Sequence, residues 1–175
     1  MQKKRGRRNL ILYHGSNLKI SKIDLNKTRP FKDFGRGFYL TEIHEQAEQM
    51  ANRVVRLFGG EPFVSEFEVD SKKAENLNTI SFDSPNNDWA LFVTHNRDKA
   101  FTDYSDLLSN HDNKYDIVFG PVANDDIAYL FRTYTSGLMD LENLVKGLSY
   151  KKLSSHISFH TQRGIDLLKA RGKNE

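Results

Sequence analysis

Short apolar or alternating runs and longer stretches of helical periodicity follow one another irregularly along this chain. The strand-like runs cover residues 9–14, 37–41, 62–69, 115–119 and 153–160. Few of them belong to the strand–helix–strand units that a doubly wound parallel sheet requires. The order therefore predicts an α+β fold. A length of 175 residues suits one domain, which we place at residues 9–175.

Five helices are expected between and after these runs, most of them beginning at a residue able to cap a first turn. The first runs from Glu42 to Phe58 and ends at the glycine pair 59–60. Residues 16–34 and 70–87 are polar and are expected to be loops. The expected capping residues are Thr41, Asn124 or Asp125, Asp140, and Thr161 for a last helix reaching Leu168. The remaining helix is expected to begin at Trp89 and run to Arg97.

The positive charge is concentrated at the start of the chain. Five of the 26 Lys and Arg residues lie within residues 1–8, and the other 21 face 23 Asp and Glu, so the remainder carries a formal −2. This segment is either a solvated terminus or a flexible basic arm that attracts phosphate backbones. No long apolar run follows it, so neither a secretory signal nor a membrane span is expected.

The chain contains no cysteine, which excludes disulfides, thiolate metal ligation and a cysteine nucleophile. This absence fits a reducing compartment, and we expect a cytoplasmic protein. We expect no metal site, because His44, His95 and His111 lack partners at ligand spacing. His156 and His160 share a predicted strand, where four residues span roughly 13 Å, too far for one ion.

The first segment with chemical potential is Tyr13-His14-Gly15-Ser16, at the end of an apolar run. It places an imidazole beside a glycine whose backbone a ligand can approach closely. Taken alone, a histidine at the end of a strand is more often structural than functional.

The second segment is residues 34–41, Phe-Gly-Arg-Gly-Phe-Tyr-Leu-Thr. In a strand, Tyr39 would share a face with Gly37 and Thr41, and its ring could stack a flat ligand. The alternative is a turn followed by a core tyrosine. The glycine pair lacks the third glycine of a dinucleotide fingerprint, and the chain has no phosphate-binding loop.

Together these segments resemble the ADP-ribosyltransferase superfamily, on the side with a His–Tyr–Glu pattern, and within it a bacterial family of unknown function. The resemblance extends from about Leu10 to Leu168. Other stretches that match lie at Trp89 to Arg97, Tyr115 to Asp125, and Ile157 to Thr161, the last being Ile-Ser-Phe-His-Thr.

The resemblance implies a split, strongly bent β-sheet with NAD in the cleft between its halves. His14 would hydrogen-bond the adenosine-side ribose, and the Gly15 backbone would hold the nicotinamide carboxamide. Tyr39 would stack on the nicotinamide ring beside a glycine-lined wall. The remaining residues expected at the dinucleotide are Ser16, Gly37 and Thr41.

The third catalytic position departs from the superfamily, which has Glu at the start of the late strand. The matching residue is His156, with Gln162 six positions later. The usual residue accepts a hydrogen bond from the nicotinamide-ribose hydroxyl and stabilises the positive charge that develops as nicotinamide leaves. A neutral imidazole can accept such a bond and an imidazolium cannot. His156 therefore indicates a pH-sensitive, weakened or inactive enzyme, unless it is only a solvated strand residue.

By resemblance, we expect an NAD-dependent mono-ADP-ribosyltransferase that modifies a protein or nucleic acid acceptor, with His14, Tyr39 and His156 as catalytic residues. By family analogy it would be toxin-like, with a partner antitoxin. The alternative is a catalytically impaired module of the same fold that binds NAD, ADP-ribose or a protein. A plain nucleic-acid-binding domain is disfavoured by the net negative charge after residue 8.

Overall fold

The computed structural model describes residues 10–124 and 127–172, and over these ranges the fold is α+β, as predicted. The strands are β1 (Leu10–Ser16), β2 (Phe38–Leu40), β3 (Phe63–Val69), β4 (Thr79–Ser81), β5 (Ile117–Pro121), β6 (Ser155–Phe159) and β7 (Leu168–Arg171). The helices are α1 (His44–Phe58), α2 (Asn87–Arg97), α3 (Ala128–Thr135), α4 (Leu141–Ser149) and α5 (Gln162–Ile165), with short 3-10 helices η1 (Leu25–Lys27) and η2 (Ser71–Asn76). The basic arm at residues 1–8 and the proposed cap Asp125 lie outside the described residues.

The chain divides into two compact units, each assembled from separate segments. Within the described ranges, unit 1 contains residues 10–23, 40–76 and 165–172. Unit 2 contains residues 24–39 and 77–164.

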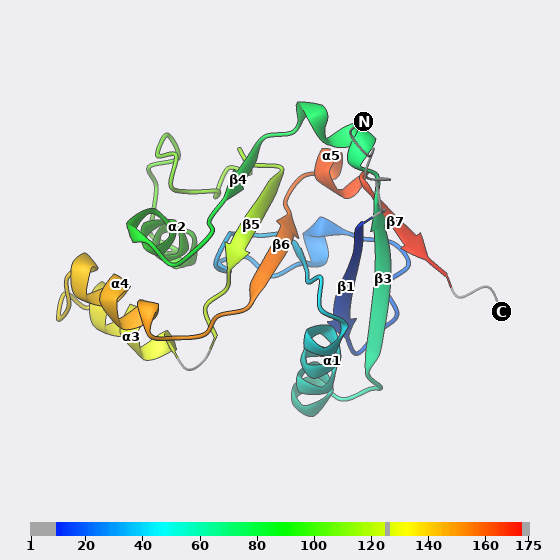
Figure 1. Cartoon of the computed structure of the whole chain (residues 1–175), viewed down its shortest axis with the longest axis horizontal. Coiled ribbons are helices and arrows are strands. Elements are labelled where there is room, and N and C mark those ends of the chain that lie inside the picture. Colours follow the sequence, from blue (N-terminus) through cyan, green and yellow to red (C-terminus); the bar gives the residue numbers. More distant parts are fainter. Residues whose placement is uncertain (1–9, 125–126, 173–175) are drawn as a thin grey trace, which may run out of the picture. The chain divides into compact units, whose positions relative to one another are not determined.

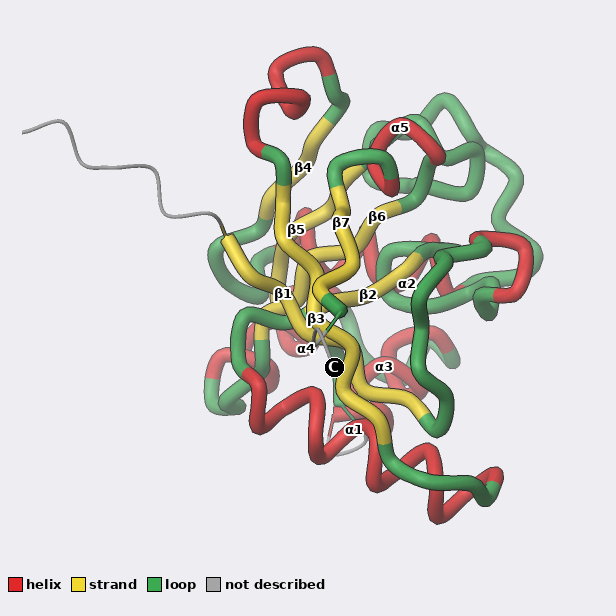
Figure 2. Tube along the Cα trace, turned by 90° about the vertical axis from the view of Figure 1, so that its right-hand side faces the viewer, coloured by secondary structure: helices red, strands yellow, loops and turns green. Residues whose placement is uncertain are grey.

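Unit 1 is built on a three-stranded antiparallel sheet in the order β1-β3-β7 (Figure 2). The helix α1 packs on β1 and β3 (Figure 1). It comes so close that a Cβ on Gly15 would lie 1.8 Å from the carbonyl oxygen of Ala47. The buried residues of α1 at this point, Ala47 and Ala51, have small side chains. Because Gly15 of β1 has no side chain, the backbones of the helix and the strand can come into contact.

The end of α1 agrees with the prediction, but its start does not, because the helix begins at His44 with Ile43 as its N-cap and no side chain capping it. The hydroxyl of Thr41, the predicted cap, accepts a hydrogen bond from the N–H of Ile43 (3.1 Å), the residue before the helix. The helix ends where Gly59 adopts a positive φ of 77°. Thr41 also exchanges two backbone hydrogen bonds with Tyr13, of 2.8 and 3.0 Å, which tie it to β1.

The sheet of unit 2 has the order β2-β6-β5-β4 (Figure 1). β5 and β6 are antiparallel, whereas β4 and β5 are parallel and are joined by a crossover that contains α2. The helices α2, α3 and α4 pack together and share one apolar core with Val118 of β5. The single tryptophan, Trp89, is fully buried there, and its indole N–H donates to the Pro121 carbonyl at 2.8 Å.

Two strands were not predicted. β4 lies inside the segment expected to be a loop, because its three residues, Thr79 to Ser81, acquire strand geometry only by pairing with residues 117–119 of β5. β7 replaces the end of the expected last helix. Thr161 caps α5 as predicted, accepting from the Gly164 N–H at 3.2 Å, but the helix stops at Ile165 and Leu168 pairs with Val69 of β3.

No helix within residues 10–124 and 127–172 combines the length and apolar character needed to cross a bilayer.

Candidate functional site

Tyr39 lies on β2, and its side chain is held in a fixed position by the preceding loop. The hydroxyl accepts a hydrogen bond from the Phe34 N–H (3.0 Å) and donates one to the Gly35 carbonyl (2.9 Å). Burial raises the pKa of Tyr39 well above its ordinary value of 10.0, so the hydroxyl keeps its proton. The phenol is therefore a positioned ring and not an acid or base at neutral pH.

Three side chains surround the Tyr39 ring. Phe34 stacks on it with ring centroids 6.0 Å apart and planes inclined by 13°. His160 meets it edge-on, with centroids 6.1 Å apart. The Lys32 ammonium lies 4.2 Å from the ring centroid, within range of a cation–π interaction. Lys32 and Tyr39 are each partly buried.

The loop that carries Lys32 and Phe34 is anchored by the buried Asp33. One carboxylate oxygen of Asp33 accepts from Nε (2.8 Å) and Nη2 (2.6 Å) of Arg97, at the end of α2. The other oxygen accepts from the Ala123 N–H at 2.5 Å. Charge-assisted bonds of this kind are stronger than neutral ones. They hold the loop in the position that clamps the Tyr39 hydroxyl.

His160 follows β6 and is almost fully buried beside Tyr39 and Gly37. Its Nδ1 lies 2.7 Å from the Arg36 carbonyl oxygen, which can only accept, so Nδ1 carries the hydrogen. Nε2 then accepts from the Ser158 hydroxyl at 2.7 Å. Burial lowers the pKa of His160 from 6.5 to about 4, so the ring is neutral at neutral pH.

His156 lies on the same face of the sheet as Ser158 and His160, because side chains two and four residues apart in a strand share a face. Since His160 touches Tyr39, the structure places the predicted residues Tyr39 and His156 on one face of the unit 2 sheet. His156 is half-buried and pairs across the strands with Gly120. Ser158 and His160, on the same polar face, are buried, and Ser158 pairs across the strands with the buried Val118.

The first motif lies in unit 1, where strand alternation separates its members. Gly15 faces α1, and Tyr13, on the same side, contacts the His44 ring with centroids 5.0 Å apart. His14 and Ser16 therefore lie on the opposite face of the sheet, and both are half-buried. His14 pairs across the strands with Ser65 of β3. His14 and Ser16 thus lie on the same face of the sheet, whereas the Cα of Gly15 faces α1.

The side chain of Thr41 serves the start of α1. Its hydroxyl lies 2.7 Å from Oε1 of Gln46, to which it donates, and it accepts from the Ile43 N–H. Thr41 is 4% exposed. Gln162, the other residue considered for the third position, is the exposed first residue of α5.

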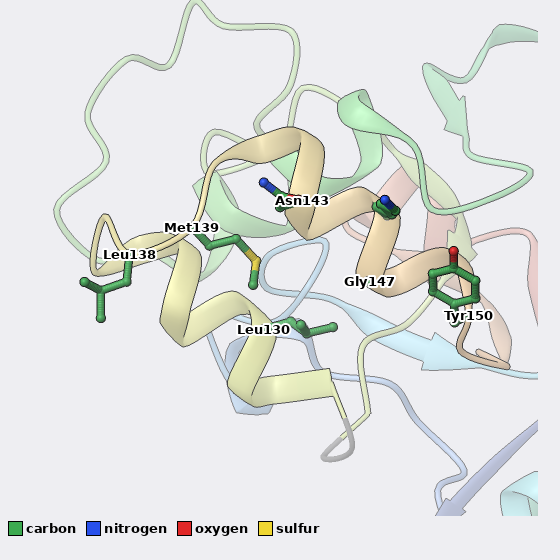
Figure 3. A pocket seen from close by; sticks show the side chains of 7 residues that line it. Leu130, Leu138, Met139, Asn143, Gly147 and Tyr150 are labelled. Atoms are coloured by element: carbon green, nitrogen blue, oxygen red, sulfur yellow. The ribbon is translucent and has the colours of Figure 1, made fainter.

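An open apolar groove lies between α3 and α4 (Figure 3), and its lining includes none of the residues expected to bind NAD. Leu138 and Tyr150 stand at its rim with 82% and 78% of their surface exposed. No group of three or more His, Asp or Glu side chains in the described ranges is arranged to hold a metal ion.

Comparison with known proteins gives one match. The model of a family described as a protein of unknown function, DUF3990, matches residues 10–170. The chain belongs to this family. No curated protein and no solved structure matches the chain. The matched range includes all the residues of both sequence motifs and His156.

Sequence reasoning did not identify Lys32, Asp33 or His160 as part of the Tyr39 environment. Lys32 and Asp33 lie in a polar loop, and the Arg97 that anchors them is 64 positions away from Asp33. A signal for His160 existed in the alternation of residues 153–160, but alternation does not tell which face is buried.

Proposed function

We propose that the chain is an NAD-dependent mono-ADP-ribosyltransferase that modifies a protein or nucleic acid acceptor. In this reaction the bond between the ribose carbon and the nicotinamide nitrogen of NAD breaks. A bond then forms from that carbon to the acceptor atom, which loses a proton. Nicotinamide is the leaving group.

The observation that carries this proposal is the environment of Tyr39. Its ring is fixed by two hydrogen bonds at the hydroxyl, stacked on Phe34, and approached by the Lys32 ammonium at 4.2 Å. An aromatic face that holds a cation is suited to a flat, positively charged ring. The nicotinamide ring of NAD has both properties.

The other proposed roles are supported by the faces on which the residues lie. His156 shares a sheet face with Tyr39, where it would accept a hydrogen bond from the ribose hydroxyl as positive charge develops. His14 and Ser16 share the sheet face opposite α1, and His14 would bind the adenosine-side ribose. The glycines at 15 and 37 and the hydroxyl of Thr41 have packing or capping roles that need no ligand.

Incubation of the protein with NAD labelled in its adenosine half and total cell lysate tests the proposal. Protease and nuclease digestion in separate samples then identify the labelled polymer, and chromatography measures free nicotinamide. Tyr39→Ala, His14→Ala and His156→Ala should each lower nicotinamide release by about tenfold or more. Tyr104→Ala removes an exposed tyrosine of the same unit and serves as the matched control.

The role of neutral His156 is tested by the pH dependence of nicotinamide release. An imidazolium cannot accept a hydrogen bond and would repel the developing cation, so release should fall toward pH 5. A rate that is constant from pH 5 to pH 8 removes neutral His156 from the mechanism.

A second candidate function is an impaired module that binds NAD, ADP-ribose or a protein without transfer. It is favoured by one observation, the histidine at position 156 where the superfamily has an anion. Binding of NAD without nicotinamide release, or a cellular effect that survives all three alanine substitutions, would establish this alternative.

The toxin-like role, the partner antitoxin and the basic arm belong to the same proposal. If the acceptor is nucleic acid, the five basic residues within residues 1–8 would contribute contacts with phosphates. Deleting residues 1–8 should then reduce the slope of the logarithm of the binding constant against the logarithm of salt concentration. An unchanged slope would show that the arm does not contact the acceptor.

A further inference from the structure

Lys32 lies over one face of the Tyr39 ring, which we call the Tyr39 face. Its ammonium lies 4.2 Å from the ring centroid. A flat ligand that stacks there needs the same space, because stacked rings approach to comparable distances. A ligand can therefore use the Tyr39 face only if the Lys32 side chain moves away.

The structure determines which partner can move. The Tyr39 ring is fixed through its hydroxyl by Phe34 and Gly35, and it packs on the core of unit 2. Lys32 is held differently, since it has a long side chain with several rotatable bonds that is already partly exposed. Displacement of the Lys32 ammonium into solvent leaves the ring in place.

Burial also favours the release of the Lys32 ammonium, whereas the nearby charges on balance hold it in place. Burial lowers the pKa of Lys32 from 10.5 to about 8, with Arg29 acting in the same direction and Asp33 opposing them. The Asp33 charge is already paired with Arg97. His160 and Tyr39, which also face this region, are neutral near pH 7, since the pKa of His160 is about 4 and that of Tyr39 is raised. The ammonium is thus less well stabilised over the ring than it is in water.

We infer that the Tyr39 face is a binding site for a flat organic cation, which Lys32 occupies until such a ring displaces it. The inference rests on the proposed function, in which that ring is the nicotinamide of NAD. It adds a regulation of that site, because the ring can stack on Tyr39 only after the Lys32 side chain has moved away.

The displacement makes binding depend on pH in a defined direction. While Lys32 covers the ring its pKa is about 8, and once displaced it returns to the ordinary 10.5. Between these values the covering lysine is neutral and the displaced lysine is charged, so a rise in pH favours the covered form. Where the covered form predominates in the free protein, affinity for the ring falls about tenfold from pH 7 to pH 9.

Calorimetric titration with N-methylnicotinamidium, neutral nicotinamide and NAD at both pH values tests the inference. Lys32→Ala should bind the cationic ring equally at pH 7 and pH 9, and at pH 9 more than about tenfold more tightly than the unchanged protein. Lys32→Arg keeps a cation that does not lose its proton, so its affinity should not depend on pH. Lys99→Ala is the matched control, because Lys99 lies over a different ring, that of Phe31, at 5.7 Å.

The outcomes separate this inference from the proposed function. Equal affinities for Lys32→Ala and the unchanged protein at pH 9 overturn the inference and leave NAD binding intact. Failure of every ring to bind either protein at millimolar concentration also overturns it. Lysine-dependent binding without nicotinamide release sustains the inference and contradicts the transferase. If Lys32→Ala does not fold, the affinities of the unchanged protein at the two pH values decide.

Discussion

The imidazole of His160 fills the space that a side chain on Gly37 would require. A Cβ at residue 37 would lie 2.6 Å from Nδ1 and 2.7 Å from Cε1 of His160, and 3.0 Å from the Phe159 carbonyl oxygen. The ring cannot retreat without giving up its hydrogen bonds to Arg36 and Ser158. The glycine before β2 and the histidine after β6 are therefore a matched pair.

Gly37→Ala should destabilise the protein, because the new methyl group forces the buried His160 ring or the backbone to shift. We expect a loss of about 1 to 3 kcal/mol in the free energy of unfolding, measured by urea denaturation. Gly172→Ala is the control, since a Cβ there meets no atom within 4 Å and should change stability by less than about 0.5 kcal/mol. Equal stability of the two variants would show that the His160 ring can shift without a measurable loss of unfolding free energy.

The burial of His160 predicts an acid-sensitive stability. The pKa of His160 is about 4 in the folded protein, whereas in the unfolded chain it has the ordinary value of 6.5. Between pH 4 and pH 6.5 the unfolded chain therefore binds a proton at this ring that the folded chain does not. Stability should therefore fall as the pH drops from 6.5 to 4, by about 3 kcal/mol from this group. His160→Asn, which cannot titrate, should flatten the dependence over that window. A His160 ring that titrates near pH 6.5 by NMR would contradict the prediction.

Asp33→Asn should destabilise the fold and loosen the loop that clamps Tyr39. The substitution removes the negative charge that pairs with Arg97 and weakens the bond from the Ala123 N–H. The expected cost is about 2 to 3 kcal/mol of unfolding free energy. A double-mutant cycle with Arg97→Met should give a coupling energy above about 1 kcal/mol. Glu142→Gln, on the exposed face of α4, should leave stability unchanged within about 0.5 kcal/mol.

If the proposed transferase is correct, His156→Glu should raise the rate of nicotinamide release. A carboxylate accepts the ribose hydrogen bond and also attracts the developing positive charge, so an increase of about tenfold or more is expected. Release should also persist at lower pH than with the histidine. His44→Glu, at an exposed position on α1 outside the proposed machinery, should not change the rate. A decrease in His156→Glu would argue that the imidazole itself is required.

The elements that the sequence predicted correctly are those with strong local patterns. Helix α1 has apolar positions at helical spacing and a glycine stop, and α4 has Asp140, whose carboxylate accepts from the Asn143 N–H at 2.8 Å. β4 and β7 were missed because each is short and gains its backbone partners from a strand far away in sequence. No local pattern encodes such pairing.

The site was predictable in part for the same reason. The motifs identified Tyr39 and His14, but the surroundings of Tyr39 depend on tertiary contacts of a polar loop. The position of Lys32 follows from the Asp33–Arg97 pair, and no spacing rule relates residue 33 to residue 97. Alternation placed His156 and His160 on one face and left open whether that face meets solvent or core.

The contact between Gly15 and α1 determines what the glycine at this position can reveal about relatives of this protein. Any chain that keeps the helix this close to the first strand must keep glycine at that position, whether or not it still binds a dinucleotide. The glycine of the Tyr-His-Gly-Ser segment therefore cannot serve by itself as a mark of activity. If the proposed transferase is correct, active and inactive members should be separated by the residue at position 156 and by the side chain that lies over Tyr39.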